Sequence, residues 1–128
     1  MTDQLTSAAF RAARERLGLQ QLDIAKAANI TPMTIKRWER GDSKPSEKGW
    51  VTLNQFQAEF DRRVELLFAA HCDSDTATLP YYCSQVDLER SEGLTEPFGL
   101  ANAAMVEAAK LLQESGVTPV IEFADTDR

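Results

Sequence analysis

The sequence predicts a mainly α-helical chain with an N-terminal bundle of short helices, a long connecting helix, and a small C-terminal α+β region containing two short strands. Three observations predict this class. Short helical segments with clear ends occupy the first 45 residues, apolar residues recur every three or four positions from 50 to 67, and β-branched and aromatic runs occur near 78–83 and 117–123. The chain has 128 residues, of which 43% are hydrophobic, which suffices for one ordinary domain or two small ones.

Residues 31–41 predict a short helix with marked ends. Thr31 suits the N-cap, Pro32 the first helical position, and Gly41 the left-handed residue just past the end. Ile35 and Trp38 share one face at helical spacing. The other side displays long, polar or cationic side chains: Met33, Thr34, Lys36 and Arg37.

Residues 20–29 predict a second short helix that ends at Asn29, a residue that tolerates the left-handed conformation. Small Ala25 permits close approach of the two helices. The expected core between them consists of Ile24, Ala28, Ile30, Ile35 and Trp38. Together these positions predict a helix-turn-helix motif.

With its ending Trp38-Glu39-Arg40-Gly41, this first third of the chain resembles the Cro/CI (Xre-type) helix-turn-helix DNA-binding family. Two positions depart from the family pattern, because Gln20 stands where a Ser or Thr cap is frequent and Asn29 stands where Gly is usual. Neither departure threatens the fold.

The resemblance implies a role for the first helix, predicted from Ser7 to Leu17 with Gly18 as its stop. In this family an Arg at the place of Arg14 pairs with the Glu of the ending, here Glu39. The pair is therefore expected to be partly buried and structural. Loss of one partner would then leave an unpaired buried charge.

The resemblance also implies which residues meet double-stranded DNA. The expected contacts to base edges are Thr31, Met33, Thr34, Lys36 and Arg37. The expected contacts to the DNA backbone are Gln21, Arg40 and Lys44. For each residue, the alternative is an ordinary solvated side chain.

The net charge of −6 argues at first against a nucleic-acid partner, but the charge is unevenly distributed. Residues 1–45 hold eight Lys or Arg against five acids, giving +3, so residues 46–128 hold six against fifteen, giving −9. The helix-turn-helix is therefore expected to present a modest cationic surface, and the rest an acidic one.

A long helix is predicted to begin after Ser46 and to reach His71. Over about 24 residues it would extend about 36 Å, further than a small DNA-binding domain requires. The alternative is two helices broken near Gln55 or Gln57. The predicted domains are 1–72, the DNA-binding domain with the long helix, and 73–128, an α+β dimerisation domain.

The second domain is predicted to contain strands at 78–83 and 117–123 and helices at 84–91 and 97–115. Pro80 confines the first strand to a sheet edge or a strand start. Val120, Ile121 and Phe123 are expected to be available for burial. Two strands cannot bury both faces of a sheet, so exposed apolar area after residue 50 is expected to meet a second copy, forming a homodimer.

The order of these elements also resembles the small two-domain regulators related to the anti-CRISPR-associated autorepressors. The residues involved are Leu79-Pro80-Tyr81-Tyr82 in the first strand and Pro97-Phe98-Gly99-Leu100-Ala101-Asn102 in the last helix. The expected function is a sequence-specific, homodimeric transcriptional regulator, a repressor or autorepressor that reads an inverted-repeat operator.

Other functions are less well supported by the sequence. An antitoxin or adaptor would bury its acidic half against a partner protein, which co-purification would reveal, and RNA binding by the basic face stays open. No catalytic constellation, cofactor motif or metal-ligand spacing is evident. His71, Cys72 and Cys83 are expected to have structural or incidental roles, with reduced thiols. A cytoplasmic location is expected, since no segment reads as a leader or a membrane span.

Overall fold

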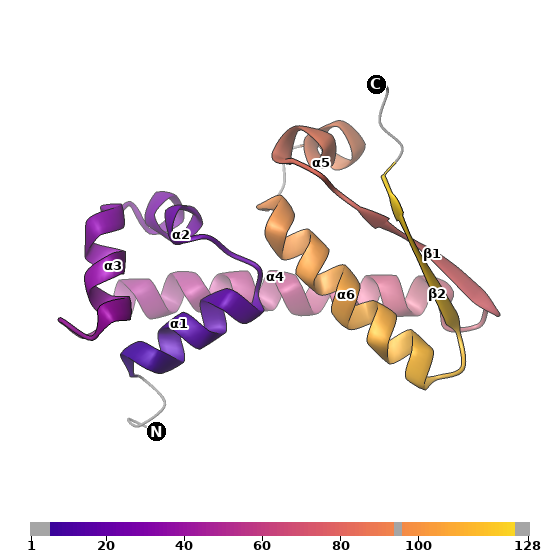
Figure 1. The fold of residues 1–128 in the computed structure, drawn as a ribbon, viewed down its shortest axis with the longest axis horizontal. Coiled ribbons are helices and arrows are strands. Elements are labelled where there is room, and N and C mark those ends of the chain that lie inside the picture. The colour runs from indigo at the N-terminus through magenta and orange to yellow at the C-terminus, as the bar shows by residue number, and fades with distance from the viewer. Residues whose placement is uncertain (1–5, 94–95, 125–128) are drawn as a thin grey trace. The chain divides into compact units, whose positions relative to one another are not determined.

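The computed structural model describes residues 6–93 and 96–124, and in these ranges the chain is mainly helical, as predicted. It divides into two compact units, Met1–Ala58 and Glu59–Arg128. The elements, labelled in Figure 1, are α1 (Ser7–Arg16), α2 (Gln21–Ala28), α3 (Pro32–Arg40), α4 (Glu47–His71), β1 (Thr76–Tyr81), α5 (Gln85–Glu92), α6 (Phe98–Glu114) and β2 (Thr118–Phe123).

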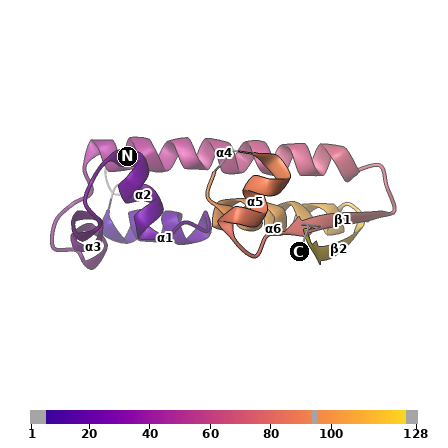
Figure 2. The same ribbon diagram turned by 90° about the horizontal axis from the view of Figure 1, so that it is seen from above.

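The predicted long helix is confirmed as α4, which runs unbroken through Gln55 and Gln57 (Figure 2). Its first turn is capped by Ser46, whose Oγ accepts a hydrogen bond from the backbone N–H of Gly49 at 3.2 Å. The predicted domain boundary lies at the end of this helix, whereas the two compact units meet within it, between Ala58 and Glu59.

An aromatic cluster joins three helices of the first unit. Phe10 on α1 is fully buried and meets the rings of Trp38 on α3 and Trp50 on α4 edge-on, at centroid distances of 5.5 and 5.2 Å. Gly49 makes this packing possible, because a Cβ at that position would lie 2.5 Å from the Trp38 ring. The cluster therefore holds the Trp38 side of α3 against α1 and α4.

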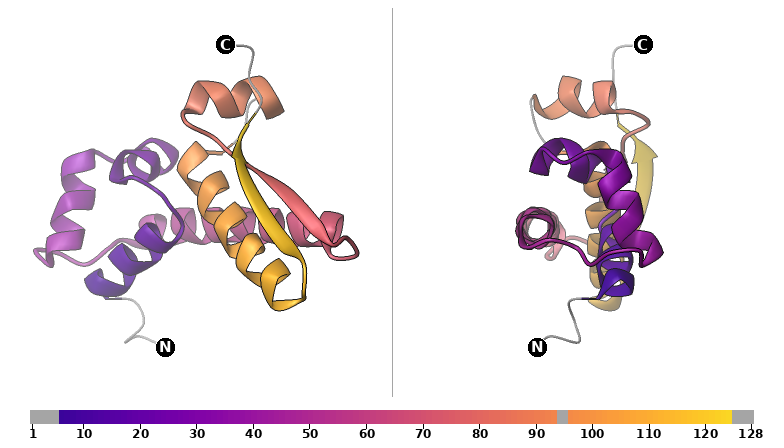
Figure 3. Two further views of the ribbon diagram at one scale, coloured as in Figure 1. Left: turned by 45° about the vertical axis from the view of Figure 1, so that its right-hand side comes forward. Right: turned by 90° about the vertical axis from the view of Figure 1, so that its left-hand side faces the viewer.

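In the second unit, β1 and β2 pair in parallel, with Thr76 opposite Thr118 and Tyr81 opposite Phe123 (Figure 3, left). The second strand lies where the sequence predicts it. The first was predicted at 78–83 and is shifted by two residues, because Tyr82 leaves the ladder to bond the side chain of Asn102 on α6.

One side of the sheet covers a small core. Leu79 packs there with Met105 and Leu112 of α6 and with Val117, all nearly inaccessible to solvent. The three β2 side chains expected to be available for burial are exposed in the described structure, with exposed fractions of 39% for Val120, 48% for Ile121 and 73% for Phe123.

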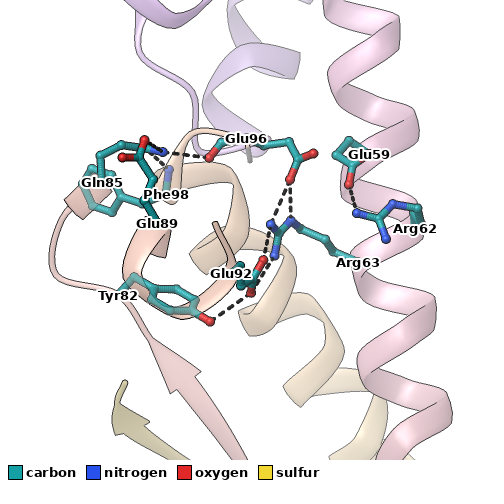
Figure 4. Close-up of polar contacts among 9 residues, drawn as sticks. All are labelled: Glu59, Arg62, Arg63, Tyr82, Gln85, Glu89, Glu92, Glu96 and Phe98. Atoms are coloured by element: carbon teal, nitrogen blue, oxygen red, sulfur yellow. Dashed lines mark hydrogen bonds and ion pairs between the residues drawn. The ribbon is translucent and has the colours of Figure 1, made fainter. Parts of the chain in front are cut away.

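A polar cluster ties α4 to α5 and to the start of α6 (Figure 4). The guanidinium of Arg63 donates to Glu92 at 2.8 Å and to Glu96 at 2.8 Å, and Tyr82 donates its hydroxyl proton to Glu92 at 3.0 Å. Burial disfavours the charged form of Arg63, but its bonds to the two carboxylates prevail and raise its pKa above the ordinary value. Gln85 extends the cluster, donating to the Glu96 carbonyl and accepting from the Phe98 N–H.

Tyr82 makes the stability of this unit sensitive to alkaline pH. Burial raises the pKa of Tyr82, and the bond to Glu92 acts in the same direction. The stability that the neutral phenol contributes is therefore fully present below its unfolded pKa of about 10 and is lost as the pH rises through the folded value. We expect Tyr82→Phe to be less stable than the parent by about 1 kcal/mol at pH 8 and this gap to shrink above pH 10. Urea unfolding at pH 8 and above pH 10 measures this difference in stability. A difference that does not change with pH would show that the Tyr82 phenol does not cause the alkaline sensitivity.

Candidate nucleic-acid interface

The helix predicted at residues 31–41, which the resemblance makes the recognition helix for DNA, is α3, and its ends are formed as expected. The Oγ1 of Thr31 accepts a hydrogen bond from the backbone N–H of Thr34 at 3.3 Å, and Pro32 occupies the first helical position. Gly41 follows with φ of +84°, a left-handed conformation that favours glycine. Local sequence therefore determines where α3 begins and ends.

The turn between α2 and α3 also forms despite the two departures from the family pattern. Asn29 takes the left-handed conformation with φ of +56°, and the next N–H, from Ile30, bonds the carbonyl of Ala25 at 2.9 Å. Gln20 is the N-cap of α2, where its backbone N–H donates to the carboxylate of Asp23 at 2.8 Å. Figure 3 (right) shows this helical pair at the front.

The back of α3 is held by a buried carboxylate. Glu39, whose side chain is 2% exposed, accepts two bonds from Arg14, at 2.6 Å from Nε and 2.9 Å from Nη2. Arg14 also donates to the carbonyl of Leu19 at 2.7 Å, and the amide nitrogen of Gln21 donates to Glu39 at 3.0 Å. The ion pair that the resemblance implied is thus present and links α1, α2 and α3.

The front of α3 is open to solvent. Thr31, Lys36 and Arg37 are exposed, and Met33 is 51% exposed. Thr34 is half-buried, and its hydroxyl shares a hydrogen bond of 2.9 Å with that of Thr31. All five residues proposed for base contacts lie on this helix or at its cap, whereas Ile35, Trp38 and Glu39 face the core.

The three residues expected at the DNA backbone differ in their surroundings. Gln21 is half-buried, and its amide is oriented by the bond to Glu39. Arg40 is exposed and pairs with Asp42 at 2.9 Å, so it must exchange this partner to reach a phosphate. Lys44 is exposed beyond the end of α3.

Two features of the molecule were missed by sequence reasoning. The bond from Gln21 to Glu39 joins residues 18 apart in the chain, and the cluster around Arg63 joins residues about 30 apart. Neither follows a helical or strand period, so no local pattern indicates them. In the described part of the chain no group of His, Cys, Asp or Glu could hold a metal ion, Cys72 and Cys83 are free, and no helix combines the length and apolarity that crossing a bilayer requires.

Comparison with known families matches residues 10–48 to the helix-turn-helix family model. A search of the curated proteins found no match. The matched segment begins at Phe10 in α1 and ends in the first turn of α4, so it contains the whole arrangement described above. The resemblance to the anti-CRISPR-associated regulators stays a prediction. The chain therefore carries a helix-turn-helix domain of the Cro/CI (Xre-type) family, the DNA-binding domain of a transcription regulator.

Proposed function

We propose that this regulator is a homodimeric repressor, or autorepressor, that reads an inverted-repeat operator in the cytoplasm. The observation that supports it best is the division of α3 into a back fixed by Glu39 and Trp38 and a front that presents Lys36 and Arg37 to solvent. A helix held this way can enter a major groove without rearranging its own core.

Each residue of the front has a chemical role in this proposal. Lys36 or Arg37 donates to O6 and N7 of guanine, Met33 contacts a thymine methyl, and the hydroxyls of Thr31 and Thr34 bond base edges. Gln21, Arg40 and Lys44 bind phosphates and set the register. The amide of Gln21 has a second N–H for this purpose, while its first is bound to Glu39.

Dimerisation supplies the affinity that one domain lacks. A single short helix reads a few base pairs, and a chain of net charge −6 gains little non-specific attraction to DNA. Two-fold symmetry doubles the contacts and requires half-site centres roughly 34–36 Å apart, about one helical turn.

The test is Arg37→Ala, which we expect to weaken operator binding about tenfold or more while leaving the melting temperature nearly unchanged, because Arg37 lies on the exposed front. Lys110→Ala, an exposed cation on α6, is the matched control for the lost charge. Calorimetry and a binding titration measure both effects. Equal binding by the two variants, or a large loss of stability in Arg37→Ala, would show that α3 does not read DNA through this face.

A further inference from the structure

The outer edge of β2 is apolar, exposed and without a neighbouring strand in the described residues. The sheet of residues 6–93 and 96–124 consists of β1 and β2 alone. On β2, Ile121 is 48% and Phe123 73% exposed, and together with Tyr81 and Glu122 they line an open, mainly apolar depression. The ring of Phe123 meets that of Tyr81 edge-on at 6.0 Å. An exposed apolar edge of this kind invites strand pairing.

The register shows which backbone groups face this edge. The N–H groups of Thr118 and Ala124 bond carbonyls of Asp75 and Tyr81, both at 2.9 Å, so even-numbered residues of β2 point toward β1. Because direction alternates along a strand, the N–H and C=O groups of Ile121 and Phe123 point to the free edge. Pro119 offers a carbonyl there but no N–H.

The opposite edge of the sheet is blocked toward the C-terminal end of β1, while Thr76 and Thr78 keep outward backbone groups. The outward positions of β1 are the even ones, where Pro80 has no N–H to donate. Just beyond, Tyr82 has both backbone groups satisfied by Asn102, which accepts at 2.9 Å and donates at 2.8 Å. Head-to-tail addition of β2 along the full β1 edge of another copy is therefore disfavoured, whereas a two-fold axis lets β2 pair with itself through the groups of Ile121 and Phe123.

We infer that the free edge of β2 is the dimerisation surface and that its occupant is β2 of a second copy, in antiparallel orientation, giving a continuous four-stranded sheet. This inference rests on the homodimeric function proposed above and names the surface that function needs. A four-stranded sheet lies within the common range, whereas an isolated strand pair is marginal.

The register of this pairing follows from hydrogen bonding and charge. With Ile121 opposite its own copy, the two Ile121 residues exchange two bonds, and each Phe123 N–H donates to the Pro119 carbonyl across the axis. This register places Glu122 opposite Val120. Shifting the axis to Glu122 would set two carboxylates directly opposite each other, which is unfavourable.

Disulfide trapping in the full-length chain tests the register, starting from Cys72→Ser with Cys83→Ser to remove the native thiols. Directly opposed residues of this kind have Cα atoms about 5.5 Å apart, within disulfide range. We expect Ile121→Cys to crosslink nearly completely on mild oxidation. Glu122→Cys should crosslink at least tenfold less, because its copies are offset by two residues, about 7 Å along the strand. Preferential crosslinking of Glu122→Cys, or none at either site, overturns this pairing.

Light scattering distinguishes a failure of this dimerisation surface from a failure of the proposed homodimeric function. We expect Ile121→Lys to raise the dissociation constant of the dimer at least tenfold, with an unchanged circular dichroism spectrum. Val106 on α6 has a similar exposed fraction, and Val106→Lys should dimerise as the parent does. If Ile121→Lys dimerises like the parent, the free edge of β2 is not the dimerisation surface, although the protein is still a homodimer. If the parent is monomeric with and without operator DNA, the homodimeric function itself fails.

Discussion

Replacing Glu39 with alanine is expected to lower the free energy of unfolding by about 3–5 kcal/mol. Its side chain is 2% exposed and accepts hydrogen bonds from Arg14 and Gln21. Removing it leaves Arg14, whose side chain is 12% exposed, without its buried carboxylate, and leaves an amide donor of Gln21 without its acceptor. Thermal unfolding followed by circular dichroism measures the loss.

The matched control is Glu15→Ala, which removes a carboxylate that also lies near Arg14, at 3.8 Å, but is 55% exposed. This change is expected to cost no more than about 0.5 kcal/mol. If Glu39→Ala instead keeps the stability of the parent and binds DNA more tightly, Glu39 is a repulsive surface charge and does not anchor the recognition helix.

Replacing Arg63 with methionine is expected to destabilise the second unit by about 2–3 kcal/mol. The change keeps an apolar stem of similar length but removes the donor shared by Glu92 and Glu96, which then repel each other beside Tyr82. The expected loss is smaller than at Glu39 because the two carboxylates are 36% and 23% exposed and retain some hydration.

Arg62→Met provides the control for Arg63, since it removes the same charge from the adjacent position of α4. Arg62 is exposed and pairs with Glu59 one turn away, so its loss should leave the urea midpoint nearly unchanged. Equal midpoints for the two variants would show that the Arg63 cluster does not hold α5 and α6 to α4.

The helix-turn-helix could be predicted from the sequence because its determinants are local. Thr31, Asn29 and Gly41 mark helix ends within a few residues of the groups that they satisfy. The long helix was predictable for the same reason, because its apolar spacing is continuous from Trp50 to Leu67.

The second unit was less predictable because its determinants are distant in sequence. The shift of β1 depends on Asn102, which lies 20 residues after Tyr82 and captures its backbone groups. The apolar residues of β2 were expected to be available for burial, but hydrophobic content alone does not distinguish a strand of the core from a strand that is exposed at a sheet edge, as β2 is. The DNA contacts stay predictions, since exposure on α3 is necessary for base contact but does not establish it.

We expect two copies of α3 to read DNA in a sequence-specific way, and this can be measured by selecting bound duplexes from a random pool with the full-length protein. We predict enrichment of one inverted repeat whose half-site centres lie about 10–10.5 base pairs apart. Enrichment of no sequence, or of a single half-site bound as tightly as the full repeat, would show that two copies of α3 do not read DNA together.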